Sequence, residues 1–210
     1  MDSENNKNAV YVKTDLPGCI IDINSDVFLP DTSGWVKIDE GVGSKYRNPQ
    51  TNYFSNPIWT EDGIARYKLV DGSVVDRTQE EIASDRLPIK KLEKIKKSKL
   101  DLAKYLASHP LQWTDGECYS ITAEKQAQLT SKVMAATMAQ TLSTDYRLTW
   151  NSTGEVCKEW TLSDLSALAF AIDARVTSLV TYQQTQEVAI NAAQTVEELE
   201  SIEVDYDKVQ

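Results

Sequence analysis

The longest helical pattern in the chain begins at Thr161, and it constrains the fold more than any other feature. Its apolar stripe consists of Leu165, Leu168, Ile172, Val176 and Leu179. Steps of three and four residues place such a stripe on one face of a helix. Thr161, three residues before Asp164, has the spacing of an N-cap. Unbroken to Ala193, this helix is roughly 45 Å long. The polar run QQTQE that begins at Gln183 predicts that its second half leaves the core.

Residues 1–77 contain short β-prone runs separated by turn residues. The runs AVYVKT, CIIDI and WVKIDE alternate with Pro-Gly and Gly-containing segments, a pattern typical of a small antiparallel β domain. The Asp71-Gly72 pair predicts a type I′ hairpin between strands Arg66–Val70 and Ser73–Asp76, because both central residues of that turn need positive φ. The many aromatic residues of this domain fill a small core, or alternatively form a sugar-binding or protein-binding face.

Residues 78–108 form an amphipathic, lysine-rich helical connector. Thr78 and Glu81 have the spacing of a capping box, and Pro88 is either the first-turn residue of a second helix or a kink. The segment carries a net charge of +3, whereas residues 1–77 carry −4 and residues 109–210 carry −9. We expect the lysines to lie on a solvated helix face or in a short coiled coil. The expected apolar stripe is Ile89, Leu92, Ile95, Leu102 and Leu106.

Residues 109–210 are predicted to form a second domain of helices with short β-hairpins. Asp115-Gly116 and the segment Asn151–Gly154 mark two hairpins. Thr122 is the expected cap of a helix over residues 123–141, whose Met134 and Met138 would fill the core. Thr195 with Glu198 marks a short terminal helix. The fold class is therefore α+β, with an antiparallel β domain, a helical connector and a mixed C-terminal domain.

The residues that carry chemistry in enzymes are few in this sequence. His109 is the only histidine, and it is expected to cap a helix end. Cys19, Cys118 and Cys157 lie far apart, which favours buried, reduced thiols over a zinc site or a disulfide. We therefore predict no catalytic residues, no metal and no cofactor, and we expect a protein that is not an enzyme.

The composition indicates which classes of partner and which cellular compartment to expect. A net charge of −10 repels phosphate backbones, so nucleic acid is not an expected partner. The chain has no run of 18 apolar residues, so no membrane partner is expected. The N-terminal sequence MDSENNKNAV lacks the basic and apolar regions of a secretory signal. We expect the protein in the cytoplasm of its cell.

Two stretches of the sequence resemble a phage family. The pattern from YVKTD through CIIDINSDVFLPDTSGWVKIDEGVGSKYRNPQTNYF to ARYKLVDGSVVDRTQEEI resembles an N-terminal module of prophage proteins encoded beside tail-fibre genes. The pattern EVCKEWTLSDLSALAFAIDARV with AINAAQTVEELESI is similar to the C-terminal domain of phage tail-fibre and tail-fibre assembly proteins. Together they cover most of residues 9–202. The family has no established catalytic residues to carry over.

This resemblance implies a phage tail-fibre assembly factor in the bacterial cytoplasm, a chaperone-like protein whose partner is the tail-fibre protein. The alternative is a virion component in the tail, such as a fibre or baseplate adaptor that docks or binds host receptors. An uncharacterised enzyme is a third, weaker hypothesis. The oligomeric state, including a homo-oligomer, stays open. For the partner surface we predict the distal half of the long helix, with Val188, Ile190 and Ala193.

Overall fold

The computed structural model describes residues 7–209, which divide into two compact units. The first unit ends at Ile89 and the second begins at Lys90, so the boundary falls within one helix, α3 (Gln79–Ser108). This helix covers nearly the whole segment predicted as a connector. Pro88 lies inside it, so it is not the first-turn residue of a second helix.

The first unit contains a three-stranded antiparallel sheet in the order β2-β1-β3. Val10 and Val12 of the central strand are fully buried and pack with Tyr67 in the core. Phe54 stacks on Tyr67 with ring centroids 4.1 Å apart, and Tyr53 also packs against this core, which supports the core interpretation for these aromatics, whereas Phe28 and Trp59 are exposed. The strands and short helices are β1 (Asn8–Thr14), β2 (Ile20–Ser25), β3 (Val36–Gly41), α1 (Ser44–Arg47) and α2 (Pro49–Asn52).

The predicted hairpin and capping box lie next to each other. Strands β4 (Tyr67–Val70) and β5 (Ser73–Asp76) pair in register, and Asp71 and Gly72 have φ of 50° and 77°. Two positive φ angles are the mark of a type I′ turn, so the hairpin is confirmed. The Glu81 amide donates to Thr78 Oγ1 at 3.2 Å, and the Thr78 amide donates to the Glu81 carboxylate at 2.9 Å. This confirms the capping box at the start of α3.

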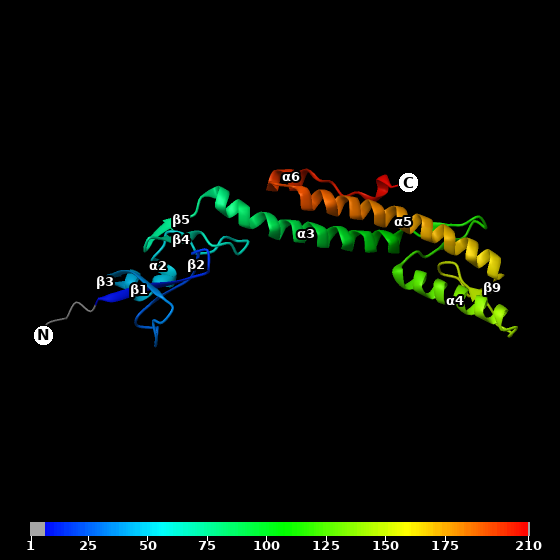
Figure 1. Ribbon diagram of the computed structural model, residues 1–210, viewed down its shortest axis with the longest axis horizontal. Helices are drawn as coiled ribbons and strands as arrows, with labels where there is room; N and C mark the ends of the chain where they lie inside the picture. The colour runs from blue at the N-terminus through cyan, green and yellow to red at the C-terminus, as the bar shows by residue number, and fades with distance from the viewer. Residues whose placement is uncertain (1–6, 210) are drawn as a thin grey trace. The chain divides into compact units, whose positions relative to one another are not determined.

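The second unit is built from helices and two-stranded hairpins, so the α+β fold class is confirmed. Figure 1 shows α5 running alongside the C-terminal part of α3. Thr122, Thr161 and Thr195 each accept a hydrogen bond from the amide three residues later, as predicted. The elements after α3 are β6 (Leu111–Gln112), β7 (Cys118–Tyr119), α4 (Ala123–Thr141), β8 (Thr149–Trp150), β9 (Lys158–Glu159), α5 (Leu162–Ala192), α6 (Val196–Ser201) and the 3₁₀ turn η1 (Tyr206–Lys208).

Lys91 and Lys94 of α3 bind the ends of other helices, which corrects the expectation of a solvated face for these two lysines, whereas Lys96 and Lys97 are exposed as expected. Lys91 Nζ donates to the carbonyl of Asn191 at 2.8 Å, and Lys94 Nζ donates to the carbonyl of Leu199 at 2.6 Å. These carbonyls end α5 and α6, where the helix dipole favours a positive charge. The predicted stripe is confirmed in part, because Leu102 and Leu106 pack in the core of the second unit, whereas Leu92 is 70% exposed.

Three further expectations can be compared with the structure. His109 Nδ1 lies 3.0 Å from the carbonyl of Tyr105 at the end of α3, so its predicted cap role is confirmed. Met134 and Met138 are exposed rather than core residues, because α4 turns Leu129 inward instead. The prediction of buried cysteines holds for Cys19 and is wrong for Cys118 and Cys157, which are exposed.

A buried polar group joins α3 to α5 and corrects the expectation that the run from Gln183 leaves the core. Gln183 is 4% exposed, and its amide nitrogen lies 3.2 Å from Ser98 Oγ and 3.1 Å from the Glu187 carboxylate. Lys99 pairs with Glu187 at 3.0 Å. The buried amide nitrogen thus has two hydrogen-bond acceptors, which is what a polar group needs in a core.

We predict that Gln183→Ala lowers the free energy of unfolding by about 2 kcal/mol, because it leaves a cavity and removes a buried hydrogen bond. The neighbouring residue Gln184 is exposed and provides the matched control. Gln184→Ala should change stability by less than about 0.5 kcal/mol. Urea unfolding of both variants makes the comparison. Equal effects of the two substitutions would contradict the buried position of Gln183.

Candidate functional site: the outer face of helix α5

The structure separates the three residues predicted to bind a partner. Val188 is 69% exposed, whereas Ile190 is fully buried and Ala193 is 6% exposed. Ile190 and Ala193 therefore cannot form part of an exposed surface, and this part of the prediction is wrong. The reason is that α5 remains packed in the second unit along its whole length, so its apolar residues at helical spacing still point inward.

The outer face of α5 carries no charge over its C-terminal two thirds. From Ala174 to Ala192 every exposed residue is uncharged. These exposed residues are Ala174, Thr177, Ser178, Thr181, Gln184, Thr185, Val188, Ala189, Asn191 and Ala192. Exposed helix faces in soluble proteins are normally rich in charge, whereas the centres of protein interfaces are depleted in it. This face therefore shares the low charge of an interface centre, although its side chains are mostly small and polar.

The two charged residues of the same stretch are used inside the unit. Arg175 donates to the carbonyl of Val209 at 2.7 Å and to the hydroxyl of Tyr105 at 3.3 Å. Glu187 pairs with Lys99 and accepts from Gln183. From Ala174 to Ala192, α5 thus directs its two charged residues inward and its neutral residues outward, whereas Asp164 and Asp173 nearer its N-terminus are exposed.

Two large apolar side chains are exposed on this side of α5, Val188 within the uncharged face and Phe170 one turn before it, with the exposed Asp173 between Phe170 and the face. Phe170 is 75% exposed and Val188 is 69% exposed. Eighteen residues separate them, which is about 27 Å along a helix. Phe170 was not predicted as a partner residue, because it lies between members of the buried stripe and does not share their spacing. The available signal was a phenylalanine two residues from both Leu168 and Ile172, where a helix points to another side.

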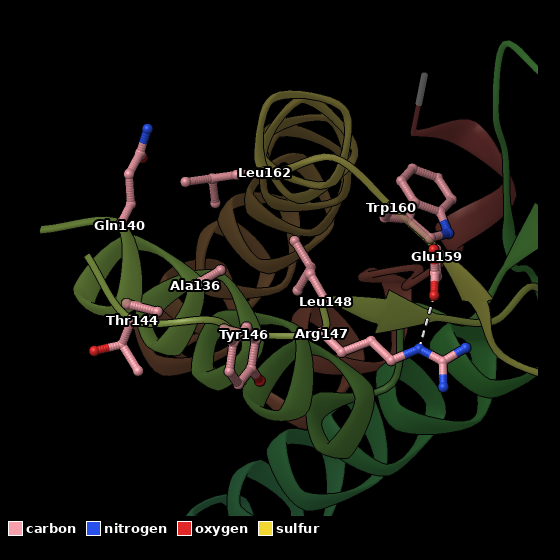
Figure 2. Close-up of a pocket in the computed structure, with 10 residues that line it drawn as sticks. Ala136, Gln140, Thr144, Tyr146, Arg147, Leu148, Glu159, Trp160 and Leu162 are labelled. Carbon is pink, nitrogen blue, oxygen red and sulfur yellow. Dashed lines mark hydrogen bonds and ion pairs between the residues drawn. The ribbon is translucent and has the colours of Figure 1, made fainter. Parts of the chain in front are cut away.

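A hollow of about 370 Å³ lies between the C-terminal half of α4 and the start of α5. In Figure 2, Ala136, Leu148 and Leu162 gather around it, and the ion pair of Arg147 with Glu159 lies to one side. The nitrogen and oxygen of that pair are 2.7 Å apart, and both side chains are largely exposed. The hollow offers apolar walls with a polar rim, which suits the side chain of a partner.

Two tyrosine hydroxyl groups of the second unit form hydrogen bonds that hold parts of the fold together. The hydroxyl of Tyr206 donates to the carbonyl of Ser98 at 2.8 Å, and burial raises the pKa of Tyr206 to about 12. Burial, with the hydrogen bond to Asp115, also raises the pKa of Tyr119. Within residues 7–209 no group of three or more His, Cys, Asp or Glu side chains is placed to hold a metal ion.

Helix α5 is long and apolar enough, by length and composition alone, to cross a membrane. In the structure, however, Leu165, Leu168 and Leu179 are fully buried in the core of the second unit. A buried apolar stripe is the arrangement of a core helix. That the chain has no membrane partner stays a prediction from the sequence.

Comparison with known proteins yields no relative. No protein-family model, no curated protein and no solved structure matches the chain.

From the raised pKa of Tyr206 we predict that the protein loses stability at alkaline pH. Its pKa in the folded chain, about 12, exceeds the value of about 10 for an unfolded tyrosine. The folded state therefore holds this proton more tightly, and the resulting stability is complete below about pH 10 and lost as the pH rises toward 12. We expect Tyr206→Phe to lose less stability across this window than the wild type, as measured by urea unfolding at each pH. Parallel curves for the two proteins would contradict this.

Proposed function

We propose that this chain is a phage tail-fibre assembly factor, which binds the tail-fibre protein in the cytoplasm of the bacterial host until the fibre trimer forms. The observation that carries the proposal is the uncharged outer face of α5 from Ala174 to Ala192, with the exposed Val188 within it and the exposed Phe170 one turn before it. The resemblance of the sequence to proteins encoded beside tail-fibre genes adds the identity of the partner.

The physical task of such a factor fits this surface. A folding β-rich fibre exposes unpaired strand edges and apolar side chains, which aggregate unless they are covered. A long, neutral face can cover such a segment without burying an unpaired charge, and burial of an unpaired charge is costly. Val188 supplies apolar contact within this face, and Phe170 supplies it one turn before the face begins.

Co-expression with a fibre protein encoded beside this chain tests the proposal. The wild type should increase the yield of soluble fibre trimer, and Phe170→Asp or Val188→Asp should reduce this gain by about tenfold, because each places a carboxylate in the contact. Leu92→Asp is the matched control, since Leu92 is as exposed as Val188 but lies on α3. It should leave the gain unchanged. A gain that none of the three variants alters would exclude this face.

Ile190→Asp separates binding from folding. Ile190 is fully buried, so a carboxylate there should destabilise the second unit by more than about 3 kcal/mol. Val188→Asp, two residues away, should leave the thermal unfolding temperature nearly unchanged because the side chain is exposed. Circular dichroism melting curves of both variants show which one folds. If Val188→Asp also unfolds the chain, its effect on the fibre says nothing about contact, and Phe170→Asp becomes the deciding variant.

A further inference from the structure

A second hollow, of about 610 Å³, lies along α4 and shares one lining residue with the hollow in Figure 2. Tyr146, which is 41% exposed, lines both hollows. Lys125, Lys132 and Trp150 also line the second hollow. Trp150 is only 5% exposed, so the indole belongs to the core and contributes to the wall. The hollow thus combines apolar walls with two amines in a protein whose net charge is −10.

The two amines of this hollow lack carboxylate partners. Within residues 7–209, neither Lys125 nor Lys132 forms an ion pair, although both are partly buried. Lys125 Nζ instead lies 5.2 Å from the centre of the Trp150 ring. The one carboxylate on the wall, Glu124, accepts a hydrogen bond from Gln128 at 3.1 Å. A partly desolvated ammonium group gains most from a carboxylate brought by a partner.

The spacing of the amines indicates the kind of ligand. Lys125 and Lys132 are seven residues apart, which is about 10 Å along a helix. An extended chain covers that distance in about three residues. Two acidic residues three apart in an extended peptide therefore match the two amines, and Tyr146 on the same wall offers contact to an apolar side chain of the peptide. A nucleic-acid strand fits less well, because Lys125 already covers the buried indole and no base can stack on it.

We propose that this hollow binds an acidic, extended segment of a partner protein, with carboxylates at Lys125 and Lys132 and an apolar side chain against Tyr146. The inference goes beyond the proposed function, because it assigns a second surface, on α4, and requires no particular partner.

A labelled peptide tests it with the full chain. The probe is a fluorescein-labelled synthetic peptide that contains Glu-Leu-Leu-Glu, and its counterpart contains Gln-Leu-Leu-Gln. Fluorescence anisotropy should show binding of the glutamate peptide that weakens with added salt. We expect the glutamine peptide to bind about tenfold more weakly.

Substitution of one lysine gives the matched comparison. Lys132→Gln should weaken binding of the glutamate peptide by about tenfold. Lys96→Gln removes the same charge from an exposed lysine of α3 that likewise forms no ion pair within the described residues, and it should have no effect. Lys132 makes no side-chain hydrogen bond there either, so its substitution should not disturb folding, which a melting curve verifies.

Four results would overturn the inference. These are no binding of the glutamate peptide, equal binding of the two peptides, equal affinity of Lys132→Gln and wild type, and displacement of the peptide by a lower concentration of oligothymidylate than of unlabelled peptide. The last result would assign the hollow to nucleic acid. None of these results depends on the fibre co-expression assay, so the failure of one proposal is distinguishable from the failure of the other.

Discussion

The burial of one face of α5 is the constraint on which the second unit depends. Its fully or nearly fully buried apolar residues are Leu165, Leu168, Ile172, Leu179 and Ile190. Each such side chain contributes roughly 1.5–3 kcal/mol when it leaves water. The face runs the length of the helix, so α3, α4 and the C-terminal segment all pack around it. Tyr206 and Leu106, far apart in sequence, meet α5 in the same core.

This packing also determines where nearby polar and charged side chains lie. Gln183 lies on the buried side and is tolerated because Ser98 and Glu187 accept its hydrogen bonds. The lysines of α3 are drawn to the carbonyl ends of α5 and α6, where Lys91 and Lys94 bind. Arg175 and Glu187 bind inside the unit, so the face of α5 from Ala174 to Ala192 has no exposed charge. A neutral face on an acidic protein is the surface best suited to contact without charge repulsion, which is why the proposed function is placed there.

Local signals predicted much of the fold. The Asp71-Gly72 hairpin and the threonine caps of α4, α5 and α6 depend on residues within a few positions of one another, so the sequence alone specifies them. The predictions were wrong where contacts with residues far away in the sequence determine whether a side chain is buried. Gln183 was predicted to leave the core because the contact with Ser98 of α3 cannot be read from the local sequence. Ile190 was predicted to contact a partner, but it is buried in the folded chain. Lys125 and Lys132 line the same hollow because the segment around Tyr146 lies beside α4, and the local sequence does not specify that position.

Mass spectrometry of purified phage particles tests the central claim most directly, because a transient assembly factor and a virion component differ in where they end up. The measurement compares the amount of this chain with that of the tail-fibre protein, in the lysate and in the particles. The account predicts that the chain is found with the fibre protein in the lysate and is absent from finished particles. A fixed ratio of this chain to the fibre in the particles would contradict it and would identify the chain as a structural component of the tail.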